Sequence, residues 1–231
     1  MKNAQRIFSQ ALKEGTKSLL EPQAKTVCKE YGIPVTRFEV ATSEGEAVKS
    51  AETIGYPVVL KIISPDIIHK SDAGGVMVGP KSADEVRSGY NQILKNVKKF
   101  NSKAKIVGVL VQEMAPSGTE VIVGAIKDPQ FGPAIMFGLG GIFVEVLKDV
   151  TFRIAPITED EACDMISEVK AYPLLKGYRN TPPADMGAIT NILLCTSKLV
   201  TDHPEIKELD LNPIMVYKKG AKTVDARIIL E

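Results

Sequence analysis

The sequence is poor in cysteine, has almost no net charge and contains no long apolar run. Its three cysteines, Cys28, Cys163 and Cys195, are isolated and lack C-x-x-C spacing, which argues against a disulfide framework and a zinc site. No apolar run approaches the roughly 20 residues of a membrane span. The net charge of +1 indicates neither a nucleic acid nor an anionic membrane as partner. Residues 1–15 are amphipathic and lack the apolar segment of a secretory signal, so we expect a cytoplasmic protein.

The composition is that of a globular protein. The 231 residues are 44% apolar and 25% charged, enough for a sizeable core in one large domain or two small lobes. The first half predicts helices over residues 6–31, 42–55 and 82–100, the first interrupted where Pro22 suits an initial helical turn. It also predicts strands over 36–40, 58–63, 75–79 and 106–114.

The second half predicts an antiparallel sheet. Strand-like runs joined by turn residues cover 120–128, 132–140 and 150–156, and helices are expected over 158–172 and 183–204. Residues 206–230 read as a hairpin of two strands joined by a Lys-Lys-Gly-Ala-Lys turn. We therefore expect an α+β (α/β) fold with two lobes, residues 1–114 and 115–231.

Lys61 interrupts an apolar strand and is followed by a loop rich in hydrogen-bond donors. A lysine in such a strand either reaches solvent along its stem or points into a cleft where it holds an anion. The loop "HKSDAGG" contains His69 and the pair Gly74 and Gly75, whose backbone N–H groups suit a phosphate. It matches neither a Walker A motif nor a dinucleotide-binding fingerprint, because another strand follows it. The alternative is a plain hairpin turn.

Three oxygen-bearing side chains are expected on one face of the final hairpin. Asp210 and Asn212 are two positions apart on a strand, and Asp225 lies across the turn from them. Carboxylate and amide oxygens are the ligands that Mg²⁺ takes, with phosphate oxygens and water completing the octahedron. A polar strand face that simply meets water is the alternative, but Leu209 and Leu211 mark the other face as the buried one.

The segment "VQEMAPSGTE" is expected to bind the base and ribose of a nucleotide. Gln112 and Met114 are candidates for the adenine pocket, and Glu113 and Glu120 are the carboxylates available for the ribose hydroxyl groups. Glu120 is equally natural at the start of an exposed strand. Arg153 is a cation in an otherwise apolar strand, and the reasoning applied to Lys61 applies to it.

Taken together, these features resemble the nucleotide site of ATP-grasp enzymes. The segments 55–76 and 120–158 and the motif "ELDLNPI" (208–214) closely resemble the β subunit of archaeal ADP-forming acetyl-CoA synthetase, also called acetate–CoA ligase (ADP-forming). The resemblance spans nearly the whole chain and implies a two-lobed ATP-grasp fold. It also implies that acyl-CoA, ADP and phosphate become the free acid, CoA and ATP through phosphohistidine intermediates.

The resemblance further implies a partner and a division of roles. The family's α subunit contributes the CoA site and the main catalytic histidine, in a hetero-oligomer such as α2β2, and the β subunit contributes the nucleotide site with Mg²⁺. His69 would be a second relay histidine, assisted by Lys61 and Arg153. His203, the other histidine, reads as a surface residue at a helix end. Two alternatives stay open: a stand-alone ATP-grasp carboxylate ligase and a non-catalytic nucleotide-binding subunit.

Overall fold

The computed structural model describes residues 2–179 and 182–231 and separates into two compact units. The small unit is Thr36–Ala115, and the large unit combines Met1–Val35 with Pro116–Glu231. Each unit pairs helices with an antiparallel sheet, so the expected α+β class is confirmed. Within the described ranges, no helix is long and apolar enough to cross a membrane.

The small unit is a four-stranded sheet with two helices on one face. Its strands lie in the order β1-β4-β2-β3, and all neighbours are antiparallel. Its elements are β1 (Phe38–Ala41), α3 (Glu44–Ile54), β2 (Val58–Ile63), β3 (Val76–Val78), α4 (Ala83–Phe100) and β4 (Gly108–Glu113). Both helices begin at a serine whose hydroxyl accepts a backbone N–H of the first turn, Ser43 from Glu46 and Ser82 from Glu85. The core lies between these helices and the sheet.

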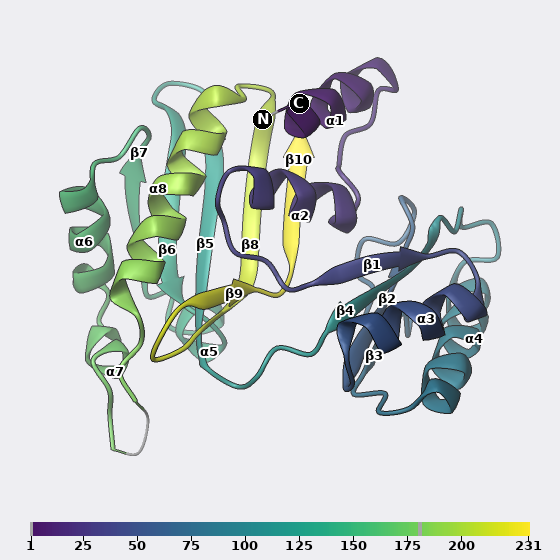
Figure 1. Cartoon of the computed structure of the whole chain (residues 1–231). Helices are drawn as coiled ribbons and strands as arrows, with labels where there is room; N and C mark the ends of the chain where they lie inside the picture. Colours follow the sequence, from purple (N-terminus) through teal and green to yellow (C-terminus); the bar gives the residue numbers. More distant parts are fainter. Residues whose placement is uncertain (1, 180–181) are drawn as a thin grey trace. The chain divides into compact units, whose positions relative to one another are not determined.

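The large unit is a six-stranded sheet with its main helices on one face (Figure 1). The strands follow the order β10-β8-β5-β6-β7, and β9 pairs with β8. Helix α8 packs across β5, β6 and β8, and α2 packs on β10. The elements are α1 (Lys2–Lys13), α2 (Glu21–Glu30), β5 (Thr119–Asp128), β6 (Gly132–Leu139), α5 (Ile142–Glu145), β7 (Val150–Ile154), α6 (Glu159–Glu168), α7 (Tyr172–Leu175), α8 (Met186–Asp202), β8 (Ile206–Val216), β9 (Ala221–Thr223) and β10 (Ala226–Leu230).

The N-terminal segment joins the large unit, whereas the sequence led us to expect it in a lobe spanning residues 1–114. The buried side chains Phe8 and Val27 belong to the core of the large sheet. The link between α1 and α2 also lies along β10, where the Leu19 N–H donates to the Ile228 carbonyl at 3.0 Å. The other expected boundary, between residues 114 and 115, lies one residue from the observed one. The sequence could not predict this packing, because the paired segments are far apart and leave no local pattern of residues.

The second strand expected in the final hairpin is divided into two short strands, β9 and β10, which both pair with β8. Pro213 on β8 has no N–H to donate to a partner strand, and the ladder is interrupted opposite it, at residues 224–225. The Val224 N–H donates to the Pro213 carbonyl at 2.9 Å, and the Asn212 N–H donates to the Asp225 carbonyl at 3.3 Å. This irregular step holds Asp225 beside Asn212.

Candidate functional site

Lys61 is buried in the small unit, on the sheet face away from the helices. Its neighbours in β2, Leu60 and Ile62, point into the core under α3 and α4, so alternation directs Lys61 to the opposite face. Only 6% of the residue is exposed, and its partners in register are Val76 and Leu110. Burial of an ammonium group requires compensating contacts, and Lys61 has interactions of its own in the folded chain.

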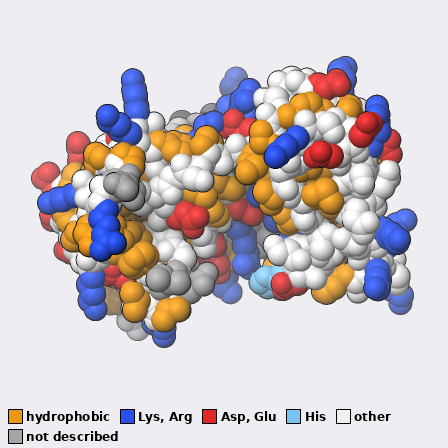
Figure 2. Space-filling model, turned by 90° about the horizontal axis from the view of Figure 1, so that it is seen from below, with side chains coloured by type: hydrophobic (Ala, Val, Ile, Leu, Met, Phe, Trp, Pro, Cys, Tyr) orange, Lys and Arg blue, Asp and Glu red, His pale blue; other side chains and the backbone are white. Residues whose placement is uncertain are grey.

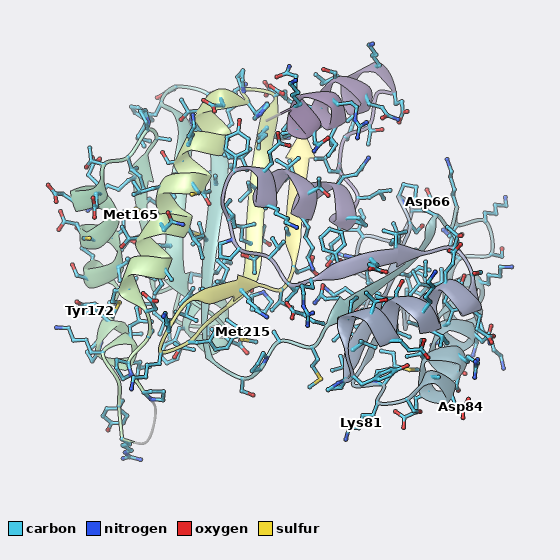
Figure 3. All side chains as sticks on the ribbon, in the orientation of Figure 1. Asp66, Lys81, Asp84, Met165, Tyr172 and Met215 are labelled. Atoms are coloured by element: carbon cyan, nitrogen blue, oxygen red, sulfur yellow. The ribbon has the colours of Figure 1, made fainter. Side chains whose placement is uncertain are left out.

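The loop between β2 and β3 presents His69 at an exposed tip. Ile67 before it and Ala73 after it are both buried in the core of the small unit. The carboxylate of Asp66, labelled in Figure 3, also accepts the Lys105 N–H at 2.7 Å. His69 therefore lies on a segment that is anchored on both sides, while its own side chain faces solvent.

Gly74 and Gly75 are required for the shape of this loop. Gly74 has a φ of +61°, and an added Cβ would lie 2.7 Å from Nδ2 of Asn96. A Cβ on Gly75 would lie 2.5 Å from Cγ2 of Ile62. The Gly75 N–H donates to the Lys70 carbonyl and the Gly74 N–H to the Ser71 carbonyl, at 2.7 and 3.0 Å. These two N–H groups bond inside the loop, so the structure supports a steric role for the glycines.

The three expected metal ligands lie together in the large unit. Asp210 alternates with the buried Leu209 and Leu211 on β8 and therefore projects from the face of the sheet that α8 does not cover. Asn212 projects from the same face two residues on, and Asp225 is bonded through its backbone carbonyl to Asn212. Glu208 precedes Asp210 by two positions and adds a third carboxylate to this face.

The electrostatics of this face suit a cation. Burial is the main cause that raises the pKa of Asp210 to about 6, and the charges of Glu208 and Asp225 add to it, while Arg227 acts in the opposite direction. A divalent cation would offset this repulsion. No group of three histidine, cysteine, aspartate or glutamate side chains in the described parts of the chain forms a complete metal site. The oxygen donors nevertheless fit Mg²⁺, which keeps several ligands for water and phosphate.

Arg153 is not brought together with the metal ligands. It pairs in register with the buried Ile135 and therefore points toward the helices, where its guanidinium binds the Glu168 carboxylate on α6. The opposite face of the sheet carries Asp210 in one row with Met136 and Phe152. The strand cation expected to neutralise phosphate is thus part of an ion pair on the other side of the sheet.

The four residues expected to bind the base and ribose differ in their surroundings. Gln112 is fully buried on β4, and Met114, 43% exposed, follows that strand. Glu113 is buried, and its carboxylate accepts both the backbone N–H and the Nε–H of Arg37 at 2.8 and 3.1 Å. Glu113 therefore ties β4 to the segment before β1, which makes Glu120 the more accessible carboxylate.

Glu120 lines a hollow of about 250 Å³ in the large unit. It is exposed, and its partner in register is Met215 on β8, which is labelled in Figure 3. The backbone carbonyl of Glu120 accepts the Gly140 N–H at 2.8 Å, which brings the end of β6 against the start of β5. The remaining walls come from α5 and α7, two four-residue helices that the sequence patterns did not predict; the lining residues are Gly118, Thr119, Leu139, Gly140, Phe143, Leu174 and Tyr178.

His203 ends α8, as expected, but it is not a surface residue. Only 5% of it is exposed, and its ring packs on Phe8 with centroids 4.3 Å apart. Its Nδ1 lies 3.0 Å from Oε1 of Glu205. The aromatic residues Phe8 and Tyr31, which cover it, come from α1 and the end of α2, so the expectation was wrong because their packing here is invisible in the local sequence.

Comparison with protein-family models matches residues 10–230 to a family described as an ATP-grasp domain. The β subunit of acetate–CoA ligase (ADP-forming) I from Pyrococcus furiosus is 52% identical over 227 residues, which cover 98% of this chain and 97% of that protein. The 4-hydroxybutyrate–CoA ligase (ADP-forming) of Nitrosopumilus maritimus is 50% identical over 227 residues, but these cover only 32% of that longer protein.

Solved structures give the same result. Acetyl-coenzyme A synthetase 1 of Ca. Korarchaeum cryptofilum, in complex with coenzyme A and Ca-AMPCP, superposes with a TM-score of 0.97 at 52% identity, covering 99% of this chain and all of that one. A complex of the same enzyme with coenzyme A and Mg-AMPPCP has a phosphohistidine segment pointing towards the nucleotide binding site; its TM-score is 0.88 at 48% identity, covering 99% of this chain and 100% of that one.

Proposed function

The chain belongs to the ATP-grasp family, among the β subunits of ADP-forming acetate–CoA ligases, and from this premise we propose how its residues divide the work. The enzyme converts an acyl-CoA, ADP and phosphate to the acid, CoA and ATP through phosphohistidine. The observation that carries this assignment is a match of about half the residues over nearly the full length of both chains. Full-length similarity to β subunits favours this function over a stand-alone carboxylate ligase.

A partner subunit supplies the CoA site and the main catalytic histidine. In relatives such as the Nitrosopumilus ligase, the matching segment is about a third of one longer chain. We place the rest of that chemistry in an α subunit, within a hetero-oligomer such as α2β2 in the cytoplasm. The present chain then binds the nucleotide and receives the phosphoryl group.

The nucleotide phosphates are held by the Lys61 ammonium and by Mg²⁺. Asp210, Asn212 and Asp225 hold Mg²⁺ through side-chain oxygens, and the cation supplies charge neutralisation for phosphoryl transfer when it is bound. Supporting this role, these side chains share the sheet face that α8 does not cover, where the carboxylate charges repel one another. Lys61 acts as a point charge on the phosphates.

Separate residues are assigned to the base and to the ribose of the nucleotide. Gln112 and Met114 contact the base, and the Glu120 carboxylate accepts hydrogen bonds from the ribose hydroxyl groups. Glu113 orients the strand end through Arg37. Arg153 holds α6 through Glu168 and is left out of the phosphate site.

His69 is the relay nucleophile. Its imidazole takes the phosphoryl group from the partner's phosphohistidine and passes it to ADP, a transfer that a neutral imidazole can perform near pH 7. The anchored loop with an exposed tip supports this role, because a relay group must be reachable and yet positioned. Gly74 and Gly75 give the loop the shape that brings the imidazole to its tip.

The test is CoA-dependent ATP formation by the chain co-purified with its α subunit, measured for several acyl-CoAs. His69→Ala and His69→Gln should both assemble with the partner and bind ADP, but lose ATP formation by about 10³-fold or more, because an amide cannot carry a phosphoryl group. Acid-labile phosphate should appear on the wild-type chain. A fully active His69→Gln enzyme with no label on the wild-type chain would contradict the relay while leaving the nucleotide site in place.

A further inference from the structure

Asp149 is a buried carboxylate for which the proposed reaction has no use. Only 7% of the residue is exposed, and both carboxylate oxygens accept backbone N–H groups: Oδ1 from Lys170 and Oδ2 from Ala171, each at 2.8 Å. Burying a carboxylate is costly unless such charge-assisted bonds offset the loss of water. The arrangement therefore fixes the link between α6 and α7 firmly to the residue before β7.

The backbone of Asp149 also closes the loop that follows β6. Its N–H donates to the Phe143 carbonyl at 2.9 Å, so residues 143–149 return on themselves. Lys148 in this loop has a φ of +50°, a left-handed conformation that is uncommon for a residue other than glycine. One residue thus fastens two segments, α5 through its main chain and the α6–α7 link through its side chain.

Both fastened segments form walls of the hollow beside Glu120. Phe143 comes from α5, and Leu174 comes from α7, which begins at Tyr172 (labelled in Figure 3) directly after the bonded N–H groups. Tyr178 completes this wall and is 52% exposed. In Figure 2, hydrophobic side chains gather with Lys and Arg at the end of the lower face that carries α7.

The size and chemistry of the hollow restrict what it can hold. Its volume of about 250 Å³ is below the roughly 300–1,000 Å³ of pockets that enclose a whole ligand, so it suits one part of a larger molecule. Apart from Thr119 and Tyr178, which carry hydroxyl groups, apolar and glycine residues surround one carboxylate, that of Glu120. A group with neighbouring hydroxyls and an apolar edge, such as a ribose, matches this lining.

We propose that Asp149 is a positioning residue for ribose recognition: by fastening α5 to the α6–α7 link it sets the hollow in which Glu120 meets the ribose hydroxyl groups. The inference rests on the ribose role proposed for Glu120. Without the two bonds to Lys170 and Ala171, the walls are no longer held at a fixed distance, and the hydroxyl groups lose their aligned acceptor.

The test compares binding of Mg·ADP and Mg·2′,3′-dideoxy-ADP to the full chain by calorimetry. The wild-type chain should prefer ADP, and Glu120→Gln should lose that preference. Asp149→Asn leaves one N–H facing an amide N–H₂, and it should lower the preference about tenfold. Asp128→Asn is the matched control: Asp128 accepts two backbone N–H groups, from Gln130 and Phe131, in a turn that does not line the hollow. It should leave the preference unchanged.

Each outcome decides one point. A wild-type chain without preference for ADP overturns the role of Glu120, whereas a preference lost in Glu120→Gln but kept in Asp149→Asn overturns the inference alone. If Asp149→Asn does not fold, hydrogen exchange on the wild-type chain decides. ADP should then slow exchange of the Lys170 and Ala171 amides more than dideoxy-ADP does, and equal protection by the two nucleotides overturns the proposal.

Discussion

Ionised Asp210 is costly to the folded chain when no cation is bound. Burial, with the charges of Glu208 and Asp225, raises its pKa from 3.8 to about 6. A carboxyl group whose pKa is higher in the folded than in the unfolded state destabilises the fold once both states are ionised, and this penalty disappears when both are protonated. The free energy of unfolding should therefore fall as pH rises from about 4 to about 6.

We predict that Asp210→Asn stabilises the nucleotide-free chain at pH 8 by about 1–2 kcal/mol, a value reduced for partial solvent screening. At about pH 4 the gain should be close to zero. Urea unfolding of both proteins at the two pH values measures this difference. Glu208→Gln, which removes the second cause of the shift, should give a smaller gain; no gain at pH 8 in either variant would show that the carboxylates do not repel one another.

Lys61 should contribute to phosphate binding. We predict that Lys61→Met weakens Mg·ADP binding about tenfold or more and AMP binding less, because AMP has one phosphate fewer. Methionine has a similar length but cannot make the polar interactions of Lys61 within the folded chain, so urea unfolding should accompany the binding measurement to show that the variant is folded. Calorimetric titration with both nucleotides checks this, and an equal loss of affinity for ADP and AMP would place the ammonium elsewhere than on the terminal phosphate.

At the scale of one element, the loop between β2 and β3 depends on close packing at its two glycines. We predict that Gly75→Ala destabilises the chain by about 1–3 kcal/mol, because its Cβ would meet the branched side chain of Ile62 at 2.5 Å. The double variant Gly75→Ala/Ile62→Leu, in which the Cγ2 methyl group on Cβ of residue 62 is absent, should recover part of the loss.

The control for this prediction is Gly45→Ala in the first turn of α3, where a Cβ has open space and φ is not positive, as is also the case at Gly75. It should not destabilise the chain, because alanine is favoured over glycine in a helix. Thermal unfolding of the variants measures the effect. If Ile62→Leu recovers nothing, the clash with Cγ2 of Ile62 is not what makes alanine unfavourable at residue 75.

Local patterns predicted elements well where the determining residues are neighbours in sequence. Ser43 and Ser82 start helices by bonding to N–H groups three residues on, and Leu209 and Leu211 mark the buried face that leaves Asp210 on the other. The short helices α5 and α7 were missed, because four residues are too few to show a period.

Site residues whose partners are distant in sequence could not be predicted. Glu113 was expected to face a ribose, but Arg37, 76 positions earlier, binds its carboxylate. Arg153 resembled Lys61 as a cation in a strand, but its guanidinium is bound by Glu168, which lies on a packed helix. Asp149 gave no signal in the sequence, since the N–H groups it accepts lie 21 and 22 positions away.

At the scale of the whole molecule, the chain should bind nucleotide but not complete the reaction. We predict that the purified chain binds Mg·ADP and releases no CoA from acetyl-CoA and phosphate, because we place the CoA site in the partner. Adding the α subunit should restore ATP formation. Free CoA can be followed with a thiol reagent, and release by the single chain above the rate of a Lys61→Met control would contradict the division of labour between the subunits.

The discontinuous large unit has a consequence for synthesis on the ribosome. The apolar side chains of α1, such as Phe8, are made early, whereas β10, which the following segment lies against, is made about 200 residues later. At the usual rates of translation this interval lasts roughly 10–40 s. The small unit, whose residues are contiguous, has all its strands well before then. A nascent chain stalled before Ala226 would therefore carry a folded small unit beside an amphipathic helix still open to chaperones and proteases.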